Sequence, residues 1–391
     1  DQFLLFVVPL AIFKSTGSIK YSGLAFVIEW LPRIVFFPLA GFFVDRINPR
    51  YLLCGVDTGR MLVLLLALAM IAGGASTFLV LSLMMAVLSI AYVLNFVGAE
   101  ALLPRNVAVS DLPKANSILQ GVEQVTQISG PALAAVISVW GGLTPILLAG
   151  AAFFAGSALL QSMLRSQSMF SQHSFSFADL YESNRTALRV LLENKVLFHL
   201  SALTWVVNLV YGAALVVSAS VVLQVFALPE SYFGVLQTCA AVTSIVTFSL
   251  LPRFAHRFGI STLGATSFCA MILTGLVLAL SRHYTMYLVG YAALMAFDGA
   301  FSVYIRTGRS QIIPHEHLGK TTGLIGLMNM CSIPMSAAAV ALLSSHLSPF
   351  GIFGMIFGIA SILGVLLIWL GRSIFGYTTW LPTIPVKEAL T

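Results

Sequence analysis

Charged residues are scarce in this chain of 391 residues. They account for 9% of the positions, whereas hydrophobic residues account for 59%; a soluble domain has roughly 25% and 45–50% of these two classes. The shortage of charge excludes a soluble globular domain and indicates an all-α integral membrane protein with many helices. A membrane β-barrel is excluded as well, because the apolar runs are continuous and do not alternate with polar residues.

Cysteine is rare too, and the cysteines form no motif. Cys54, Cys239, Cys269 and Cys331 lie far apart, each in an apolar stretch, so we interpret them as core thiols without a disulfide framework. The sequence contains no GxxxxGKS/T phosphate loop, no HExxH and no nucleophile motif. We therefore expect neither an enzyme nor ATP as the energy source, and neither a metal nor a cofactor.

Long apolar runs, separated by turn residues and charges, predict twelve membrane-spanning helices. They lie at about 1–13, 21–44, 51–72, 76–101, 114–139, 143–164, 196–226, 230–252, 260–281, 284–305, 317–344 and 350–372. A spanning helix needs about 20 apolar residues, and the first run is shorter. Because the chain also lacks an initiating Met, we expect the first helix to be truncated at its N-terminal end.

The runs divide into two groups of six. This predicts an N-terminal bundle (1–164), a cytoplasmic linker (165–195), a C-terminal bundle (196–376) and a tail (377–391). In the linker, Leu180, Leu188, Leu191 and Leu192 share one helical face, which predicts an amphipathic helix lying along the membrane surface.

The two groups also resemble each other in sequence. "DLPKANSILQG" leads into the fifth span and "EHLGKTTGLIG" leads into the eleventh. Parallel repeats of six helices are the architecture in which a substrate site forms between the halves, near the membrane midplane. We therefore expect two pseudo-symmetric halves and a central site.

Cations show the orientation of the spans. On one side of the membrane the predicted loops and ends hold fourteen Lys and Arg residues, and on the other side only Lys14, Lys20 and Arg282. Cytoplasmic loops carry the excess of cations, so we expect both termini in the cytoplasm. The net charge of +6 does not indicate nucleic acid as a partner, because the cations form no basic stripe.

The loop "GFFVDRINPR" (41–50) joins the second and third spans. It resembles the loop signature of the major facilitator superfamily, Gly-x-x-x-Asp-Arg/Lys-x-Gly-Arg/Lys-Arg/Lys. Asn48 replaces the second glycine and Pro49 the first closing cation. Four residues match the signature: Gly41, Asp45, Arg46 and Arg50.

A second motif, "DTGR", places Asp57 and Arg60 at i, i+3 in the third span. With the stretch "LLPRNVAVSDLPKANSILQGVEQVTQISGPAL" it resembles the branch of that superfamily that holds the enterobactin exporter and macrolide-efflux proteins. "GPALAA" (130–135) resembles the Gly-Pro element of drug and proton antiporters, with Ala134 and Ala135 in place of its closing glycines. That element implies export; ordinary tight helix packing is the alternative.

The resemblance covers essentially the whole chain and implies a cytoplasmic latch that holds the outward-facing state closed. A carboxylate at Asp45 can face the positive N-terminus of a neighbouring helix and pair with a cation such as Arg60. The alternative is a stop-transfer loop whose charges are merely solvated. The expected latch residues are Gly41, Asp45, Arg46, Arg50, Asp57 and Arg60.

Glu29 and Arg33 are charges inside an otherwise apolar span, with Pro32 between them. A charge facing lipid at the midplane costs roughly 2.5–3.5 kcal/mol, so we expect a watery cavity and an i, i+4 ion pair to accommodate them. Arg33 is twelve residues from Asp45, which puts it about 18 Å away along the helix, near the midplane. The alternative is that the pair only locks helices together.

Other polar residues are predicted at a similar depth, among them a stripe on the fifth span that could equally be a helix–helix interface. Together with Arg33 they make up the expected substrate-binding set: Tyr92, Asn95, Gln120, Gln124, Gln127, Trp205, Asn208, Tyr211, Tyr291 and Arg306.

A proton carrier needs a buried carboxylate without a permanent cation partner. Glu123 and Asp298 have no cation at i±4, so we expect them to couple transport to protons. Glu29 is a weaker candidate, because Arg33 should keep it ionised.

The sequence thus predicts a monomeric secondary transporter in a bacterial inner membrane. We expect it to export an amphiphilic small molecule, a siderophore or a macrolide-like drug, by proton antiport and alternating access. Arg33 and Arg306 favour a siderophore, since arginine binds carboxylates and catecholates. The alternatives are a metal-ion exporter of the ferroportin type, a lipid flippase and a non-transporting membrane sensor.

Overall fold

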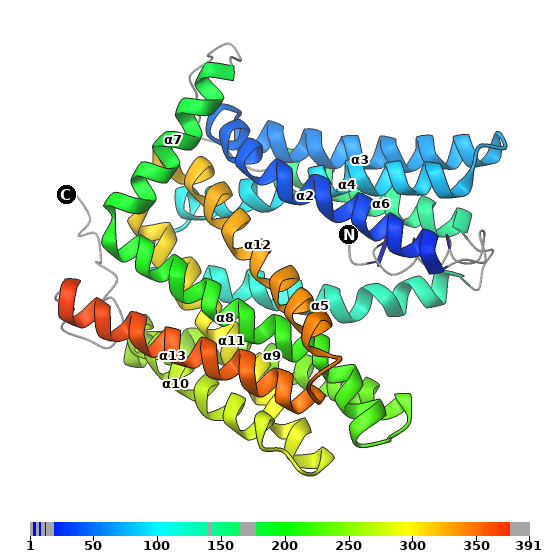
Figure 1. The fold of residues 1–391 in the computed structure, drawn as a ribbon. Helices are drawn as coiled ribbons and strands as arrows, with labels where there is room; N and C mark the ends of the chain where they lie inside the picture. The colour runs from blue at the N-terminus through cyan, green and yellow to red at the C-terminus, as the bar shows by residue number, and fades with distance from the viewer. Residues whose placement is uncertain are drawn as a thin grey trace. The chain divides into compact units, whose positions relative to one another are not determined.

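The computed structural model describes residues 19–138, 143–163 and 177–375, together with residues 3, 4, 8 and 12. All elements in this part of the chain are helices (Figure 1). The predicted tail 377–391 and the first residues of the linker lie outside the described residues, and so does most of the predicted first span.

The described residues form twelve α-helices, of which eleven correspond to the predicted second to twelfth spans and one, α7, to the predicted linker helix. In chain order they are α2 (Ile19–Arg46), α3 (Pro49–Ala72), α4 (Thr77–Asn106), α5 (Leu112–Ser138), α6 (Leu143–Ser162), α7 (Phe177–Glu193), α8 (Lys195–Ser220), α9 (Glu230–Phe258), α10 (Ile260–Ala279), α11 (Tyr284–Ile312), α12 (Leu318–Leu343) and α13 (Pro349–Phe375).

Some helices extend beyond the apolar runs that predicted them. α4 continues to Asn106 and α9 to Phe258, where the sequence predicted ends at about 101 and 252. An apolar run marks the part of a helix that contacts lipid or core, while the polar turns beyond it keep the same backbone hydrogen bonds.

Asn48 and Pro49, which depart from the family signature, form the start of α3. The side chain of Asn48 accepts a hydrogen bond from the backbone N–H of Arg50 at 3.0 Å, and Pro49 occupies the first helical position. Asn is among the preferred N-cap residues, and proline at N1 loses no helical hydrogen bond. Asn48 and Pro49 therefore start α3 directly after the short turn that follows α2.

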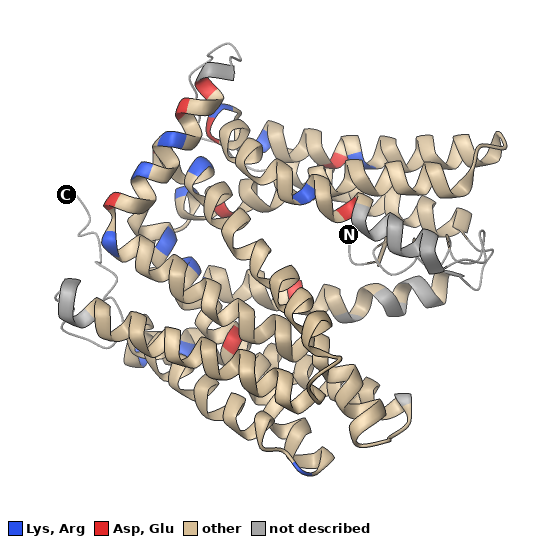
Figure 2. Cartoon of the chain, viewed as in Figure 1, with Lys and Arg blue, Asp and Glu red and all other residues tan. Residues whose placement is uncertain are grey.

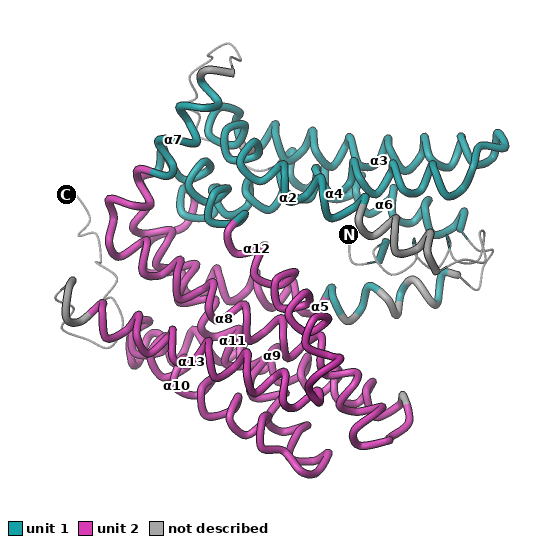
Figure 3. The backbone as a smooth tube through the Cα atoms, viewed as in Figure 1, with its two compact units in different colours: residues 1–105, 126–188, 315–327 teal, residues 106–125, 189–314, 328–391 magenta. Residues whose placement is uncertain are grey.

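The chain folds into two compact units (Figure 3). Unit 1 comprises residues 1–105, 126–188 and 315–327; unit 2 comprises residues 106–125, 189–314 and 328–391. Three helices, α5, α7 and α12, change unit along their length, and the last residue of α4 already belongs to unit 2. The first part of α7 belongs to unit 1 and its end to unit 2. The first part of α5 belongs to unit 2 and the rest to unit 1, whereas the first part of α12 belongs to unit 1 and the rest to unit 2.

Each unit has an apolar core of its own. In unit 1 the core includes Leu64, Leu81 and Leu147 from α3, α4 and α6. In unit 2, α8 packs against α11 and α13, and the core includes Tyr291 and Tyr304 of α11. Both tyrosines are fully buried.

Nine helices of the described chain are long and apolar enough to cross a membrane, and most of the helical length carries no charged residue (Figure 2). Large apolar side chains such as Leu83, Leu342 and Ile362 are exposed on their surfaces, as lipid-facing residues are. α2 and α5, which carry the charges and amides predicted for the site, are not among the nine.

Candidate functional site

Asp45, in the last turn of α2, caps the first turn of α12 within unit 1. Its Oδ1 accepts a hydrogen bond from the backbone N–H of Gly319 at 2.7 Å, and its Oδ2 accepts one from Lys320 at 2.8 Å. α12 begins at Leu318, so these are two of the N–H groups that a helix leaves unsatisfied at its positive end. The predicted contact between Asp45 and a helix N-terminus is confirmed.

A cation lies beside Asp45, as expected, but it is not Arg60, the example taken from the sequence. Arg105 lies beside Asp45 instead, with Nη2 at 3.6 Å from Oδ1, and also donates to the carbonyl oxygen of His315 at 2.8 Å. Arg60 is well inside α3, whereas Arg105 is in the last turn of α4. Spacing within one stretch of sequence could not show that the end of α4 approaches Asp45.

The two other basic residues of the loop differ in their contacts. Arg46 pairs with Asp179 of α7 at 3.3 Å, and its guanidinium lies 3.8 Å from the centre of the Phe42 ring. The linker helix is therefore tied to the end of α2. The Arg50 side chain makes no ion pair with any described residue.

Glycines let α2 and α12 approach closely behind the Asp45 contact. A Cβ atom at Gly41 would lie 2.5 Å from the carbonyl oxygen of Gly319, and one at Gly323 would lie 2.6 Å from that of Phe37. Side chains larger than hydrogen would push the helices apart. Gly319 and Gly323 were not predicted, although their four-residue spacing is a known pattern of tight helix contact.

Asp57 is the centre of a buried polar cluster that joins α3, α4 and α6. Asp57 is 1% exposed, and its carboxylate pairs with Arg60 at 3.1 Å. It also accepts hydrogen bonds from Ser157 and from Gln161 at 3.0 Å, and from Asn95 at 3.4 Å. Asn95, predicted to bind substrate, thus lies in this cluster. Ser157 and Gln161 were missed, because two isolated polar residues in α6 form no motif.

Glu29 and Arg33 form the predicted ion pair, at 3.2 Å between Glu29 Oε1 and Arg33 Nη2. They are only 2% and 7% exposed. The guanidinium carbon lies 4.7 Å from the centre of the Trp30 ring and 4.4 Å from that of Tyr92. Tyr92 joins the pair in lining one small pocket of unit 1, so three predicted site residues are brought together here.

In unit 2, the first part of α5 is joined to α11 by polar contacts. Glu123 and Arg306 lie 3.3 Å apart, and Gln120 donates to Ser302 at 2.7 Å. The expectation that Glu123 lacks a cation partner was therefore wrong. That expectation considered cations on the same helix only, and Arg306 comes from α11.

Asp298, about two turns before Arg306 in α11, differs from Glu123. It is half-buried, and it makes no hydrogen bond or ion pair with any described residue. Tyr291 is fully buried and donates to Gln237 at 3.3 Å, while Trp205 and Tyr211 pack against the core of unit 2.

The remaining predicted residues are less constrained. Asn208 and Gln124 are half-buried, and Gln127 is exposed and belongs to unit 1. The side chains of Pro131, Ala134 and Ala135, in the Gly-Pro element, lie outside the described part of the chain. No group of three or more His, Cys, Asp or Glu residues in the described part is arranged to hold a metal ion.

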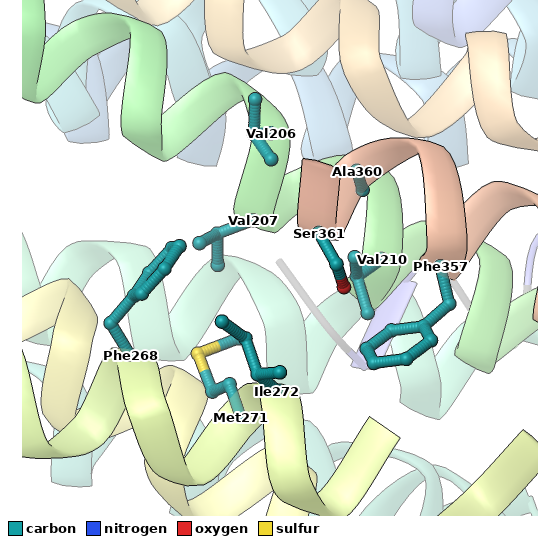
Figure 4. A pocket seen from close by; sticks show the side chains of 9 residues that line it. All are labelled: Val206, Val207, Val210, Phe268, Met271, Ile272, Phe357, Ala360 and Ser361. Atoms are coloured by element: carbon teal, nitrogen blue, oxygen red, sulfur yellow. The ribbon is translucent and has the colours of Figure 1, made fainter. Parts of the chain in front are cut away.

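A second pocket lies in unit 2 between α8, α10 and α13 (Figure 4). Its lining is apolar and includes Val207, Phe268, Met271 and Phe357, with the Ser361 hydroxyl as its polar group. It contains none of the predicted site residues. None of the described residues that line this pocket is charged, so it suits an uncharged, mainly apolar group.

Solved structures of similar fold are transporters. A bacterial homologue of the iron transporter ferroportin, in an outward-facing state, aligns with a TM-score of 0.78 at 17% identity, over 95% of this chain and 96% of that one. A human organic anion transporter aligns with a TM-score of 0.71 at 14% identity, over 94% and 97%. A proton:xylose symporter aligns with a TM-score of 0.68 at 14% identity, over 94% and 93%.

No curated protein matches the sequence. Residues 1–305 match the Major Facilitator Superfamily, which is well over half of the chain. That match agrees with the loop motif at 41–50, with the membrane-spanning helices and with the fold of the solved transporters. The chain is a multi-pass membrane protein, and it belongs to the Major Facilitator Superfamily.

Proposed function

We propose that the chain is a secondary active exporter of an amphiphilic small molecule, driven by proton antiport. The observation that carries the proposal is the pocket with Glu29, Arg33 and Tyr92, which places an ion pair beside the apolar side chains of Met85 and Leu88. Ionisable residues inside membrane spans are costly and mark transport pathways. Such a lining suits a molecule with an apolar body and a charged group, such as a siderophore.

Asp298 supports the proton-driven part of the proposal. A carrier must be neutral in one state and ionised in the other, which a permanent cation partner would prevent. Among the described residues Asp298 has no such partner, whereas Glu123 pairs with Arg306. We therefore assign the main proton-carrying role to Asp298.

The Asp45 contact supports the alternating-access part. Two hydrogen bonds and the nearby Arg105 tie α2 to the first turn of α12, and their loss would release that turn. In the proposed cycle these contacts form in the outward-facing state and break in the inward-facing one. The protein would work in a bacterial inner membrane, as a monomer, with both termini in the cytoplasm.

The test is proton flux in vesicles reconstituted with the purified protein. The vesicles are loaded with a catecholate siderophore, a macrolide or divalent metal ions in turn, and an inward proton gradient is imposed. We expect the siderophore or the macrolide to leave the vesicles against its gradient while protons enter, and a protonophore to stop this. Protein-free vesicles and the Asp298→Asn variant are the controls.

Two results would replace the proposal by an alternative. Proton flux with divalent metals alone would favour a metal exporter, a class included because the ferroportin homologue shares the fold. Movement of labelled lipid between leaflets, without any proton flux, would favour a flippase.

A further inference from the structure

The Arg33 guanidinium contacts the Glu29 carboxylate through fewer N–H groups than an arginine can offer. Only Nη2 contacts Glu29, at 3.2 Å, and the buried Nε has no hydrogen-bond partner in the described part of the chain. An arginine offers five N–H donors in a planar fork, and a carboxylate in the best geometry takes two of them at once. The pair as it stands leaves a donor of Arg33 unsatisfied in a buried place.

The surroundings fix the guanidinium and leave space beside it. Trp30 and Tyr92 have their ring centres 4.7 and 4.4 Å from its central carbon, and contacts of this kind stabilise a cation over an aromatic face. The pocket next to it is lined otherwise by Leu4, Met85, Leu88 and Ser89. The pocket, of about 10 Å³, has room for about one water molecule, so a ligand carboxylate would have to take the place of the Glu29 side chain.

We propose that Arg33 is the subsite for a carboxylate group of the transported molecule, and that Glu29 takes up one proton when this carboxylate replaces it. The proposal rests on the proposed function, because it names the chemical class that the exporter carries: an organic acid with an apolar or aromatic body. It also gives Glu29 a role distinct from that of Asp298.

The charge balance of the pocket gives the reason for the proton. Glu29 and Arg33 now cancel each other, and both are more than nine-tenths buried. A second carboxylate on Arg33 would leave Glu29 as an uncompensated buried negative charge, which is strongly unfavourable. Among the described residues that line the pocket only Glu29, Arg33 and Tyr92 titrate, and neither arginine nor a neutral tyrosine can supply the missing charge. A proton from water therefore binds to Glu29.

One proton thus enters the pocket together with each carboxylate. Proton and substrate bind together at this subsite rather than excluding each other. The protons that the proposed antiport moves in the opposite direction must then travel on another carboxylate, which is the role given above to Asp298.

The experiment measures binding rather than transport. Benzoate is the probe, and benzamide, its neutral analogue of the same size, is the ligand control. Ligand-observed NMR titrations give the affinity of the full chain in nanodiscs between about pH 7 and about pH 9, where benzoate stays ionised. Because the slope of affinity with pH counts the protons taken up, the wild-type affinity should fall about tenfold per pH unit.

Three variants complete the test. Glu29→Gln should bind benzoate with an affinity that no longer depends on pH. Arg33→Gln should lose at least about tenfold in affinity, the loss expected when a bidentate charged contact worth more than about 1.4 kcal/mol is removed. Arg253→Gln, which removes an exposed arginine of α9, should behave like the wild type, and benzamide should not discriminate between the variants.

The proposal is overturned if wild-type protein does not bind benzoate, if Arg33→Gln binds it as the wild type does, or if Glu29→Gln keeps the pH slope. If the Arg33→Gln variant does not fold, the pH dependence of benzoate affinity in Glu29→Gln alone tests the proposal. Failure of the vesicle assay with intact pH-linked binding would count against the exporter and not against the subsite. Proton-driven export with pH-independent binding would count against the subsite and not against the exporter.

Discussion

The guanidinium of Arg306 lies 3.3 Å from the carboxylate of Glu123, which is 183 positions earlier in the chain. The side chain of Arg306 is 10% exposed and that of Glu123 is 38% exposed, so the pair lies at the edge of the buried region. With the neighbouring contact of Gln120 to Ser302, it fastens the first part of α5 to α11 inside unit 2.

This ion pair should give a measurable coupling in a double-mutant cycle. Because Glu123 is partly in solvent, we expect a coupling energy of about 0.2–1 kcal/mol from Glu123→Gln and Arg306→Gln. Unfolding in mixed micelles measures it. In a control cycle, Glu123→Gln is combined with Arg257→Gln, which changes an exposed residue of α9, and their effects on the free energy of unfolding should add. If the effects of Glu123→Gln and Arg306→Gln also add, the two side chains do not stabilise each other.

Asp298→Asn should remove uphill, proton-driven export while exchange of substrate down its gradient continues. The amide keeps the size and the hydrogen-bonding capacity of the side chain but cannot titrate. Both modes are measured in the same vesicles, with and without a pH gradient. Asp111→Asn, at an exposed position, is the matched control. If the Asp298→Asn variant still exports substrate uphill, another carboxylate carries the proton, and Glu29 or Glu100 is tested next.

Asp45→Asn should abolish transport and leave both folding and substrate affinity close to those of the wild type. The carboxylate accepts one N–H group on each oxygen, whereas an amide offers one acceptor oxygen and an NH₂ group that opposes the second donor. Transport in vesicles and substrate binding in micelles are compared on one preparation. Transport at the wild-type rate in this variant would show that the contact is not part of the cycle.

Gly323→Ala should destabilise the protein, although alanine is the better helix former. Its Cβ would lie 2.6 Å from the carbonyl oxygen of Phe37, so α2 and α12 would have to separate. A Cβ atom at Gly55 in α3 would meet no atom of the described chain within 4 Å, and Gly55→Ala should stabilise by about 0.5–1 kcal/mol. Thermal unfolding of the two variants should therefore shift in opposite directions, and a shift in the same direction would contradict the close approach.

Asp57→Asn should be among the most destabilising single changes in unit 1, at about 3–5 kcal/mol, because it removes one partner of a buried ion pair. Asp179→Asn breaks the pair with Arg46, whose side chains are 28% and 41% exposed, and should cost less than about 1 kcal/mol. Equilibrium unfolding of both variants makes the comparison. Similar costs would mean that the Asp57 cluster does not hold α3, α4 and α6 together.

Local patterns in the sequence were enough for the helices and for contacts within one helix. Apolar runs predicted the spans, because a helix must be apolar over the thickness of the bilayer. The i, i+4 spacing predicted the ion pair of Glu29 and Arg33, and the i, i+3 spacing led to the pair of Asp57 and Arg60. The sequence also predicted that the Asp45 carboxylate faces a helix N-terminus, because free N–H groups there bind a negative charge. It did not show that this helix is α12.

Contacts between distant helices were not predictable in this way. Arg105 beside Asp45, Arg306 beside Glu123 and Ser157 beside Asp57 each come from another part of the chain. Their partners depend on which helices meet in the fold, and a single sequence carries no record of that. The same limit explains why Asn95 was predicted at the substrate site and is found in the Asp57 cluster.

The Asp45 contact also has a consequence for how the protein is made. Gly319 follows Asp45 by 274 residues, and a ribosome adding about 5–20 residues per second needs about 14–55 s to cover that distance. Throughout this time α2 is complete while residues 315–327, which belong to the same unit, do not yet exist. The Asp45 carboxylate and the Gly41 backbone thus wait without their partners on α12, and unit 1 is completed only after residues 315–327 have been made.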